Sequence, residues 1–322
     1  MQRKLIWDSH TCLPLHPDVD IGILERHLDS GTSFVSVNVG MDMNPIEQIM
    51  AVISSFRKQI ATHPKMIQVE SISDVERAHQ DRKLAIAFDL EGAIPLLERP
   101  EMVELYYDLG VRQIHLAYNR NNAVAGGCHD EDTGLTDLGR RMVSAINQAG
   151  MIIDVSHTGY TTTLDIFACS ETPVVFSHSN PDALLHHRRN ITDEQMKGCA
   201  STGGVVCLNG VGRFLGTREL GIAPLLRHVT YVAELIGTEH VGLGIDTMFQ
   251  QEGIDDTPPN FDAHYWWPPE DYKAELPKMT FIQPESFPEI IEGLSKLGFS
   301  ESEVDQIVGL NMYGIAEQTW KP

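Results

Sequence analysis

The chain has 322 residues, of which 42% are hydrophobic and 21% are charged. This length and composition fit a large globular domain with a substantial core and exclude a disordered or fibrous chain. The formal net charge is -21, from 45 acidic residues against 24 Lys or Arg. So acidic a surface argues against nucleic-acid and anionic-membrane partners, because phosphate binding needs clustered Lys and Arg.

The first residues and the cysteines indicate the compartment. Residues 1–10 (MQRKLIWDSH) lack the apolar core of about 7–15 residues that a secretory signal carries. No apolar run approaches the roughly 18 residues of a membrane span. The five cysteines are widely spaced without a CxxC pair, which argues against a disulfide framework or a structural zinc knuckle. We therefore expect a cytoplasmic protein.

Eight short apolar runs are predicted to be buried parallel strands, because such strands have near-continuous hydrophobic sequences. In chain order they are 4–10, 33–39, 84–91, 111–118, 151–157, 173–178, 204–209 and 240–246. Each stops at a polar residue: His10, Asn38, Glu91, Tyr118, His157, His178, Asn209 and Asp246. In an eight-stranded barrel the chemistry lies at the C-terminal ends of the strands. The endings therefore predict a metal centre assembled from distant parts of the chain.

Stretches with helical spacing of apolar residues separate the strands. They are 45–58, 74–80, 98–109, 136–149, 192–200 and 221–236, and Thr136 and Thr192 are expected N-caps. Alternating strands and helices predict parallel pairing with right-handed crossovers. Eight strands favour a closed (β/α)8 TIM barrel over an open doubly wound sheet.

The C-terminal part departs from this alternation. Residues 247–286 contain Pro258-Pro259, Trp266-Trp267 and Pro268-Pro269, and such prolines make a helix improbable there. We expect a long loop over the barrel mouth, which either covers substrate or contacts another subunit. Residues 287–319 are predicted to be a helical extension of two helices, the second capped by Ser300 with Glu303 three residues later. We expect 1–322 to form a single domain.

The strand endings carry ligands that suit a metal. His10 and Cys12 form an H-x-C unit whose side chains point to the same side of an extended backbone, although Cys12 is equally well explained as a small buried hydrophobe. Glu91 ends its strand before a glycine and has the geometry to bridge two cations. Asp89, two residues earlier, has a similar claim. We prefer Glu91 because its strand must run to the end before a side chain faces the barrel axis.

Two histidines share one local pattern. His157 and His178 each follow an apolar strand and a serine, and imidazole is the commonest protein ligand of zinc. Asp246 closes the last strand as either a ligand or a general base. In the basic run 186–190 (HHRRN), one arginine at the mouth is able to clamp a substrate carboxylate, and we expect the rest of the run to be solvated. Tyr118 either donates a hydrogen bond to a polarised carbonyl or only packs.

Six segments, taken in order, resemble the membrane (renal) dipeptidases and their soluble bacterial relatives, members of the metal-dependent amidohydrolase superfamily. The segments are DSHTCLP, DLEGA, DVSHTG, FSHSNPDALLHHRRN, GLGID and GFSESEVDQIVGLNMYGI. The resemblance covers nearly the whole chain and implies a (β/α)8 barrel with two zinc ions. By position, it implies that His10 and residue 12 bind the first metal, that Glu91 bridges, and that His157 and His178 bind the second. It also assigns Asp246 as the acid/base and Arg189 as the arginine for the substrate carboxylate.

Two positions depart from the family pattern. The family's first motif is usually H-x-D, so Cys12 stands where a carboxylate is expected. A thiolate binds zinc well at about 2.3 Å, but the first site is equally able to lose its metal or to prefer another ion. Tyr118 stands where mammalian members carry a substrate-polarising histidine, and a tyrosine cannot carry a positive charge at neutral pH.

We expect a zinc-dependent dipeptidase that hydrolyses short dipeptides, and the resemblance makes dipeptides with either L or D residues at the C-terminal side candidate substrates. One alternative is another amidohydrolase that acts on a small amide, N-acyl or lactone substrate, because a barrel does not determine function. A third hypothesis is a non-catalytic binding or scaffold relative, which the retained Glu91, His157, His178 and Asp246 count against. We expect a small dipeptide or amide substrate, no nucleic-acid or membrane partner, and a homodimer.

Overall fold

The strands form where the apolar runs lie. The computed structural model describes residues 3–217, 221–272 and 279–321. Each of the eight predicted runs contains a strand, and two short strands, β3 and β10, were not predicted. The strands are β1 (Trp7–Cys12), β2 (Phe34–Met41), β3 (Met66–Gln68), β4 (Leu84–Glu91), β5 (Val111–His115), β6 (Ile152–Asp154), β7 (Val174–Val175), β8 (Val206–Leu208), β9 (Val241–Leu243) and β10 (Thr247–Met248).

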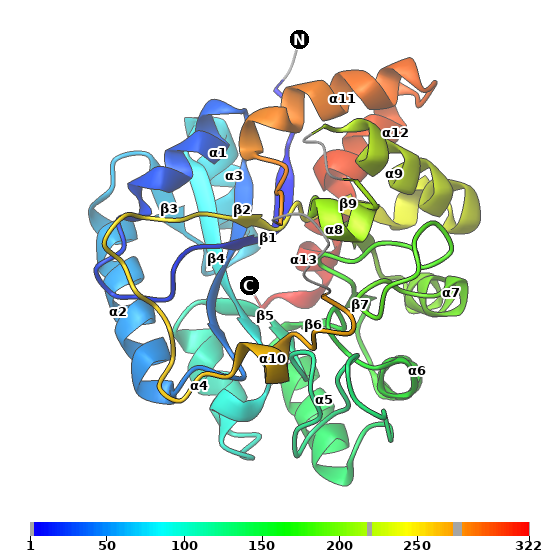
Figure 1. The fold of residues 1–322 in the computed structure, drawn as a ribbon. Helices are drawn as coiled ribbons and strands as arrows, with labels where there is room; N and C mark the ends of the chain where they lie inside the picture. Colours follow the sequence, from blue (N-terminus) through cyan, green and yellow to red (C-terminus); the bar gives the residue numbers. More distant parts are fainter. Residues whose placement is uncertain (1–2, 218–220, 273–278, 322) are drawn as a thin grey trace.

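The strands pair in parallel and curl into a barrel. One sheet has the order β10-β1-β2-β4-β5-β6-β7, with β3 on the side of β4, and β8 pairs with β9. A parallel bridge between Phe176 and Val206 joins β7 to β8, and β10, which follows β9 closely, pairs with β1. Figure 1 shows the strands at the centre with the helices around them. The predicted (β/α)8 barrel is therefore confirmed.

Helices alternate with the strands, as the spacing predicted. They are α1 (Glu25–Asp29), α2 (Ile46–Thr62), α3 (Ile72–Asp81), α4 (Met102–Asp108), α5 (Asp137–Ala149), α6 (Tyr160–Cys169), α7 (Asp193–Ser201), α8 (Gly212–Leu215), α9 (Ala223–Ile236), α10 (Ala263–Trp266), α11 (Phe287–Lys296), α12 (Glu301–Asp305) and α13 (Asn311–Thr319). Thr136 and Thr192 cap α5 and α7, because their side chains accept from the backbone amides of Gly139 and Gln195. Helix α6 was missed because three consecutive threonines, which are poor helix formers, follow its first residue, Tyr160.

The segment 247–286 corrects one expectation. It contains the short helix α10, where helix was judged improbable, because the side chain of Asp262 caps its first turn and Pro268 follows the helix instead of interrupting it. Residues 273–278 of this segment lie outside the described residues. The yellow-to-gold part of the chain after β10 crosses the front of the barrel in Figure 1.

The last helix, α13, ends at the side of the barrel where the strands begin. Trp320, just after α13, contacts the stacked rings of Trp7 and Phe34, which start β1 and β2. Helix α12 has the predicted capping box between Ser300 and Glu303 and continues through the π-helical turn η5 (Gln306–Leu310) into α13. These contacts leave the opposite end, where the strands stop, free to form a site. In the described part of the chain, no helix has the length and apolar character needed to cross a membrane.

Candidate metal centre

Strand β1 places His10 and Cys12 on the same side of the barrel end. The Nε2 atom of His10 lies 3.4 Å from the Cys12 sulfur and 3.8 Å from Oδ1 of Asp246. The backbone amide of Asp246 donates to the His10 carbonyl at 3.2 Å, which ties the segment after β9 to β1. Burial raises the pKa of the Cys12 thiol to about 12, although nearby His10 opposes the shift. These three side chains together form a potential cation site.

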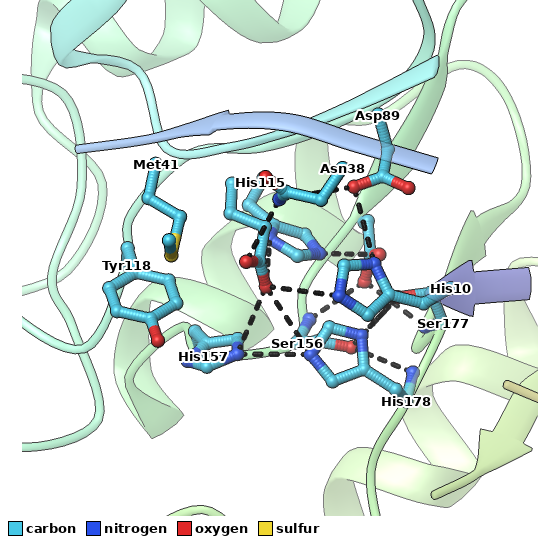
Figure 2. Close-up of polar contacts among 12 residues, drawn as sticks. His10, Asn38, Met41, Asp89, His115, Tyr118, Ser156, His157, Ser177 and His178 are labelled. Atoms are coloured by element: carbon cyan, nitrogen blue, oxygen red, sulfur yellow. Dashed lines mark hydrogen bonds and ion pairs between the residues drawn. The ribbon is translucent and has the colours of Figure 1, made fainter. Parts of the chain in front are cut away.

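Glu91 lies among the imidazoles. Its Oε1 atom is 3.2 Å from Nε2 of His157, 3.5 Å from Nε2 of His178 and 3.7 Å from Nε2 of His10. Its other oxygen accepts a hydrogen bond of 2.9 Å from the Asn38 side chain. Burial raises the pKa of Glu91 to about 7, against the charges of nearby histidines. Figure 2 shows the rings of His10, His157 and His178 turned toward one another.

The two later histidines face each other across the site. Their Nε2 atoms are 2.9 Å apart. The side-chain nitrogen of Asn119 donates to the Trp266 carbonyl, which turns the amide oxygen toward His157. Because that oxygen can only accept, Nδ1 of His157 is the donor in the 2.7 Å hydrogen bond between them. Nε2 of His157 therefore carries a lone pair. Burial and the charge of Arg189 lower the pKa of His157 well below its usual value. Burial and the charges of neighbouring histidines do the same to the pKa of His178. Both rings are thus neutral, which is the form that binds metals.

The spacing of these donors suits metal coordination. Ligand atoms on one tetrahedral zinc at about 2.0–2.3 Å stand roughly 3.3–3.7 Å apart. The distances from Glu91 to His157 and His178 and between His10 and Cys12 are close to this range, whereas the two imidazoles, 2.9 Å apart, would have to separate slightly around an ion. Within the described residues, Oε1 of Glu91 is buried and has no hydrogen-bond partner. A buried carboxylate oxygen without a partner is costly, and a bound cation would remove that cost.

A cavity of about 510 Å³ opens beside these ligands. Arg189 and Tyr118 line it together with His10, Cys12, Glu91, His157 and Asp246. Much of the remaining wall is apolar and includes side chains of the segment after β10. These wall residues are Leu13, Met41, Met43, Phe214, Met248, Phe249, Ile254, Phe261, Trp267, Met279 and Phe281.

Arg189 and Tyr118 both reach this cavity from loops. Arg189 is 3% exposed, donates through Nη2 to the His178 carbonyl at 3.3 Å, and its Nε has no hydrogen-bond partner in the described chain. Tyr118 stacks on His157 with ring centroids 4.3 Å apart. Elsewhere in the basic run, His186 and Arg188 are exposed as expected, whereas His187 is half-buried between Phe214 and Tyr272.

Comparison with known proteins places the chain in a family. A profile of the membrane dipeptidases, peptidase family M19, matches residues 16–262. The chain belongs to this family. The match begins after His10 and Cys12, so the membrane dipeptidase profile does not cover the first two proposed ligands.

Relatives of the membrane dipeptidase family support the same fold. The chain is 27% identical over 251 residues, or 76% of its length, to dipeptidase verJ of Clonostachys rogersoniana, and it spans only 58% of that relative's length. The structure of an amidohydrolase from Pseudomonas aeruginosa superposes with a TM-score of 0.87 at 25% identity, covering 98% of this chain and 97% of the other. A metallopeptidase from Rhodobacter sphaeroides, solved with a phosphinate mimic of the dipeptide L-Ala-D-Ala, has a TM-score of 0.79 at 20% identity, covering 99% of this chain and 100% of the other.

The structure also adds residues that the sequence analysis of this family member missed. His115 ends β5 and is 1% exposed, with Nδ1 3.7 Å from Oε1 of Glu91 and Nε2 2.5 Å from Oδ2 of Asp154. Asp89, weighed against Glu91, instead contacts the other ring nitrogen of His10, with Oδ1 3.2 Å from Nδ1. The apolar run continues through Leu116 and Ala117, so the sequence pattern placed the polar ending at Tyr118, although β5 stops three residues earlier.

Two of the proposed site residues have left-handed backbones. The φ angles are 64° at His157 and 54° at Asp246, and Asn119, the partner of His157, has a φ of 60°. Non-glycine residues rarely adopt this region and pay about 1–3 kcal/mol to do so. In the membrane dipeptidase fold of this chain, the strained turns directly after β6 and β9 aim both side chains into the barrel mouth.

Proposed function

We propose that this chain is a zinc-dependent dipeptidase. The observation that carries the proposal is the buried Oε1 atom of Glu91, which faces four imidazole nitrogens at 3.2–3.7 Å beside a cavity that Arg189 lines. His10, Cys12 and Glu91 would hold one ion, and Glu91, His157 and His178 the other. Bound zinc would supply Lewis-acid activation of a water molecule and of the peptide carbonyl.

Asp246 is the proposed proton carrier. Its Oδ2 accepts a hydrogen bond of 3.2 Å from the Asn209 side chain, which fixes the carboxylate and leaves Oδ1 on the side of His10. Burial raises its pKa to about 6, against the pull of His10 and Arg189. A base with a pKa near the working pH is well suited to accept a proton from the attacking water and to pass it to the leaving amine.

Arg189 and Tyr118 are the proposed substrate contacts. Arg189 is buried at the cavity wall with an Nε that no described residue satisfies, so a planar carboxylate is the ligand that its guanidinium group fits best. Such a clamp selects substrates with a free C-terminus close to the scissile bond. Tyr118 would donate a hydrogen bond to the substrate carbonyl. The apolar wall favours dipeptides with bulky apolar side chains.

Metal analysis paired with a dipeptide panel tests this function. We expect about two zinc ions per chain and hydrolysis of dipeptides with L or D residues at the C-terminal position, since the similar metallopeptidase holds an L-Ala-D-Ala mimic. No bound metal, with no effect of a chelator on stability, would refute the metallohydrolase assignment. Two bound ions with no hydrolysis of any dipeptide would favour another small amide, N-acyl or lactone substrate.

A further inference from the structure

His115 lies beside the proposed metal ligands without a role in the proposed reaction. It is the last residue of β5, its side chain is 1% exposed, and its Nδ1 points at Oε1 of Glu91 from 3.7 Å. That nitrogen has no hydrogen-bond partner among the residues described. Figure 2 shows the His115 ring beside those of His10 and His157.

Asp154 determines which nitrogen of His115 carries the proton. Oδ1 of Asp154 accepts from the backbone amides of Ser156 and Ser177 at 2.9 and 3.1 Å, and Oδ2 accepts from the Gln113 side chain at 3.1 Å. A carboxylate with so many donors is ionised and acts as an acceptor. The 2.5 Å contact to His115 is therefore an Nε2–H donation, and a neutral His115 keeps its lone pair on Nδ1.

When His115 is neutral, two buried acceptors face each other. The Nδ1 lone pair of His115 and the Oε1 atom of Glu91 repel unless a positive charge lies near both. His157 has the same arrangement: Asn119 holds one nitrogen, and the other faces the same oxygen. Metal-binding histidines in proteins commonly donate their second N–H to a carboxylate or carbonyl, which fixes the ring for the metal.

We propose that His115 is a further ligand of the metal centre and binds through Nδ1 an ion that it shares with Glu91 and His178. His115 and His178 belong, with Asp154, to a group whose potential ligand atoms lie within 4.8 Å of one another, and 3.7 Å separates Nδ1 of His115 from Oε1 of Glu91. This inference rests on the proposed function, because it requires that the centre binds metal. It enlarges the ligand set to four histidines, one glutamate and one cysteine.

His27 provides a matched control. It too is a fully buried histidine with a carboxylate partner, since its Nε2 is 3.2 Å from Oδ2 of Asp8, and its Nδ1 also has no hydrogen-bond partner in the described ranges. Asp8 is its only ion-pair partner within the described chain, and its ring packs edge-on against Phe249. Replacing His27 therefore reproduces the loss of a buried His–Asp pair without removing a proposed ligand.

The deciding experiment is the structure of the zinc-loaded wild-type protein with anomalous scattering at the zinc edge. We expect an ion within about 2.3 Å of the His115 Nδ1 atom. A well-occupied zinc centre with no ion closer than about 3 Å to this nitrogen would overturn the proposal. Dipeptide hydrolysis by the same zinc-loaded sample reports on the proposed function separately, so a failure of one is distinguishable from a failure of the other.

Variants give a second, independent measurement. In His115→Gln, we expect zinc to be lost to a competing chelator at more than about 100-fold lower chelator concentration than in wild type, and the visible spectrum of the cobalt-substituted protein to change. His27→Gln should retain the wild-type spectrum and chelator midpoint. An unchanged cobalt spectrum in His115→Gln would contradict a ligand role.

Discussion

The Nε2 atoms of His157 and His178 lie 2.9 Å apart, and Oε1 of Glu91 lies within 3.5 Å of both. Asn119 occupies the other nitrogen of His157, so this ring offers a lone pair to the centre. Ser177 Oγ is 2.7 Å from Nδ1 of His178 and, when it accepts a hydrogen bond from that nitrogen, gives His178 the same form. The contact between the rings is thus best satisfied by a shared cation.

Chelation should therefore destabilise the fold. An ion bound only by the native state stabilises it by about 4 kcal/mol when its concentration is 1,000 times Kd. We expect the Tm in a zinc-saturated buffer to fall when a chelator is added and to recover when excess zinc is returned. Thermal denaturation followed by circular dichroism makes the measurement. Identical melting curves with zinc and with chelator would show that the centre holds no ion.

Cys12 should leave a spectroscopic signature if it is a ligand. A metal lowers the pKa of a coordinated thiol and deprotonates it, despite the burial that raises the pKa of free Cys12 to about 12. The cobalt-substituted protein should then show a sulfur-to-metal charge-transfer band in the near ultraviolet. Cys12→Ser should abolish that band and lower metal occupancy at the first site. The buried Cys207, which contacts Ser9, is the matched control, and its replacement by Ser should leave the band intact.

Asp246→Asn should lower kcat by about 100- to 10,000-fold, the range for the loss of a general acid-base group. Its metal content should stay at the wild-type value, because His10, Cys12 and Glu91 are the proposed ligands of the first ion. Asp255→Asn, an exposed change outside the cavity wall, controls for the loss of one acidic residue. Steady-state kinetics and elemental analysis on the same preparations give both quantities. A variant that retains more than a tenth of the wild-type kcat would contradict the proton-transfer role.

Arg189→Met should weaken substrate binding. Leaving a buried substrate carboxylate without its charged partner costs about 2–5 kcal/mol, so we expect kcat/KM to fall by at least 30-fold. Most of the change should appear in KM, because the clamp holds the substrate throughout the reaction. An amidated dipeptide, which lacks the carboxylate, should lose this dependence on Arg189. Arg141→Met, on the exposed face of α5, is the control. Equal effects of the two variants on kcat/KM would contradict the proposed role of Arg189 in binding the substrate carboxylate.

The strands and most proposed ligands were predictable because buried parallel strands have recognisable apolar runs and because their C-terminal ends meet at one end of a barrel. His115 was missed for a local reason: Leu116 and Ala117 extend the apolar run past the true end of β5. The partners that fix tautomers, such as Asn119 and Asp154, lie on neighbouring loops and strands. Their roles depend on three-dimensional pairing, which a single sequence does not contain.

His228 provides a test of acid stability away from the metal centre. It lies on the inner face of α9, is fully buried, and neither of its ring nitrogens has a hydrogen-bond partner within the described residues. Burial, with a smaller contribution from Arg227, lowers its pKa to about 4. The unfolded chain, with a histidine pKa of about 6.5, therefore binds the proton more readily than the native state does.

The sign of the effect follows from proton linkage. Above about pH 6.5 the ring is neutral in both states and imposes no charge penalty; as the pH falls toward 4, protonation increasingly favours the unfolded chain. The difference of about 2.5 pKa units corresponds to roughly 3 kcal/mol of stability lost over that window.

His228→Leu should remove this loss, so its free energy of unfolding should fall less than that of wild type between pH 7 and about pH 4.5. Urea denaturation at both pH values measures the difference, and proton competition at the metal centre cancels because both proteins share that centre. As a control, His264→Gln, which changes an exposed histidine, should show the same pH dependence of the free energy of unfolding as wild type. If His228→Leu also shows the wild-type pH dependence, the buried imidazole does not cause the acid sensitivity.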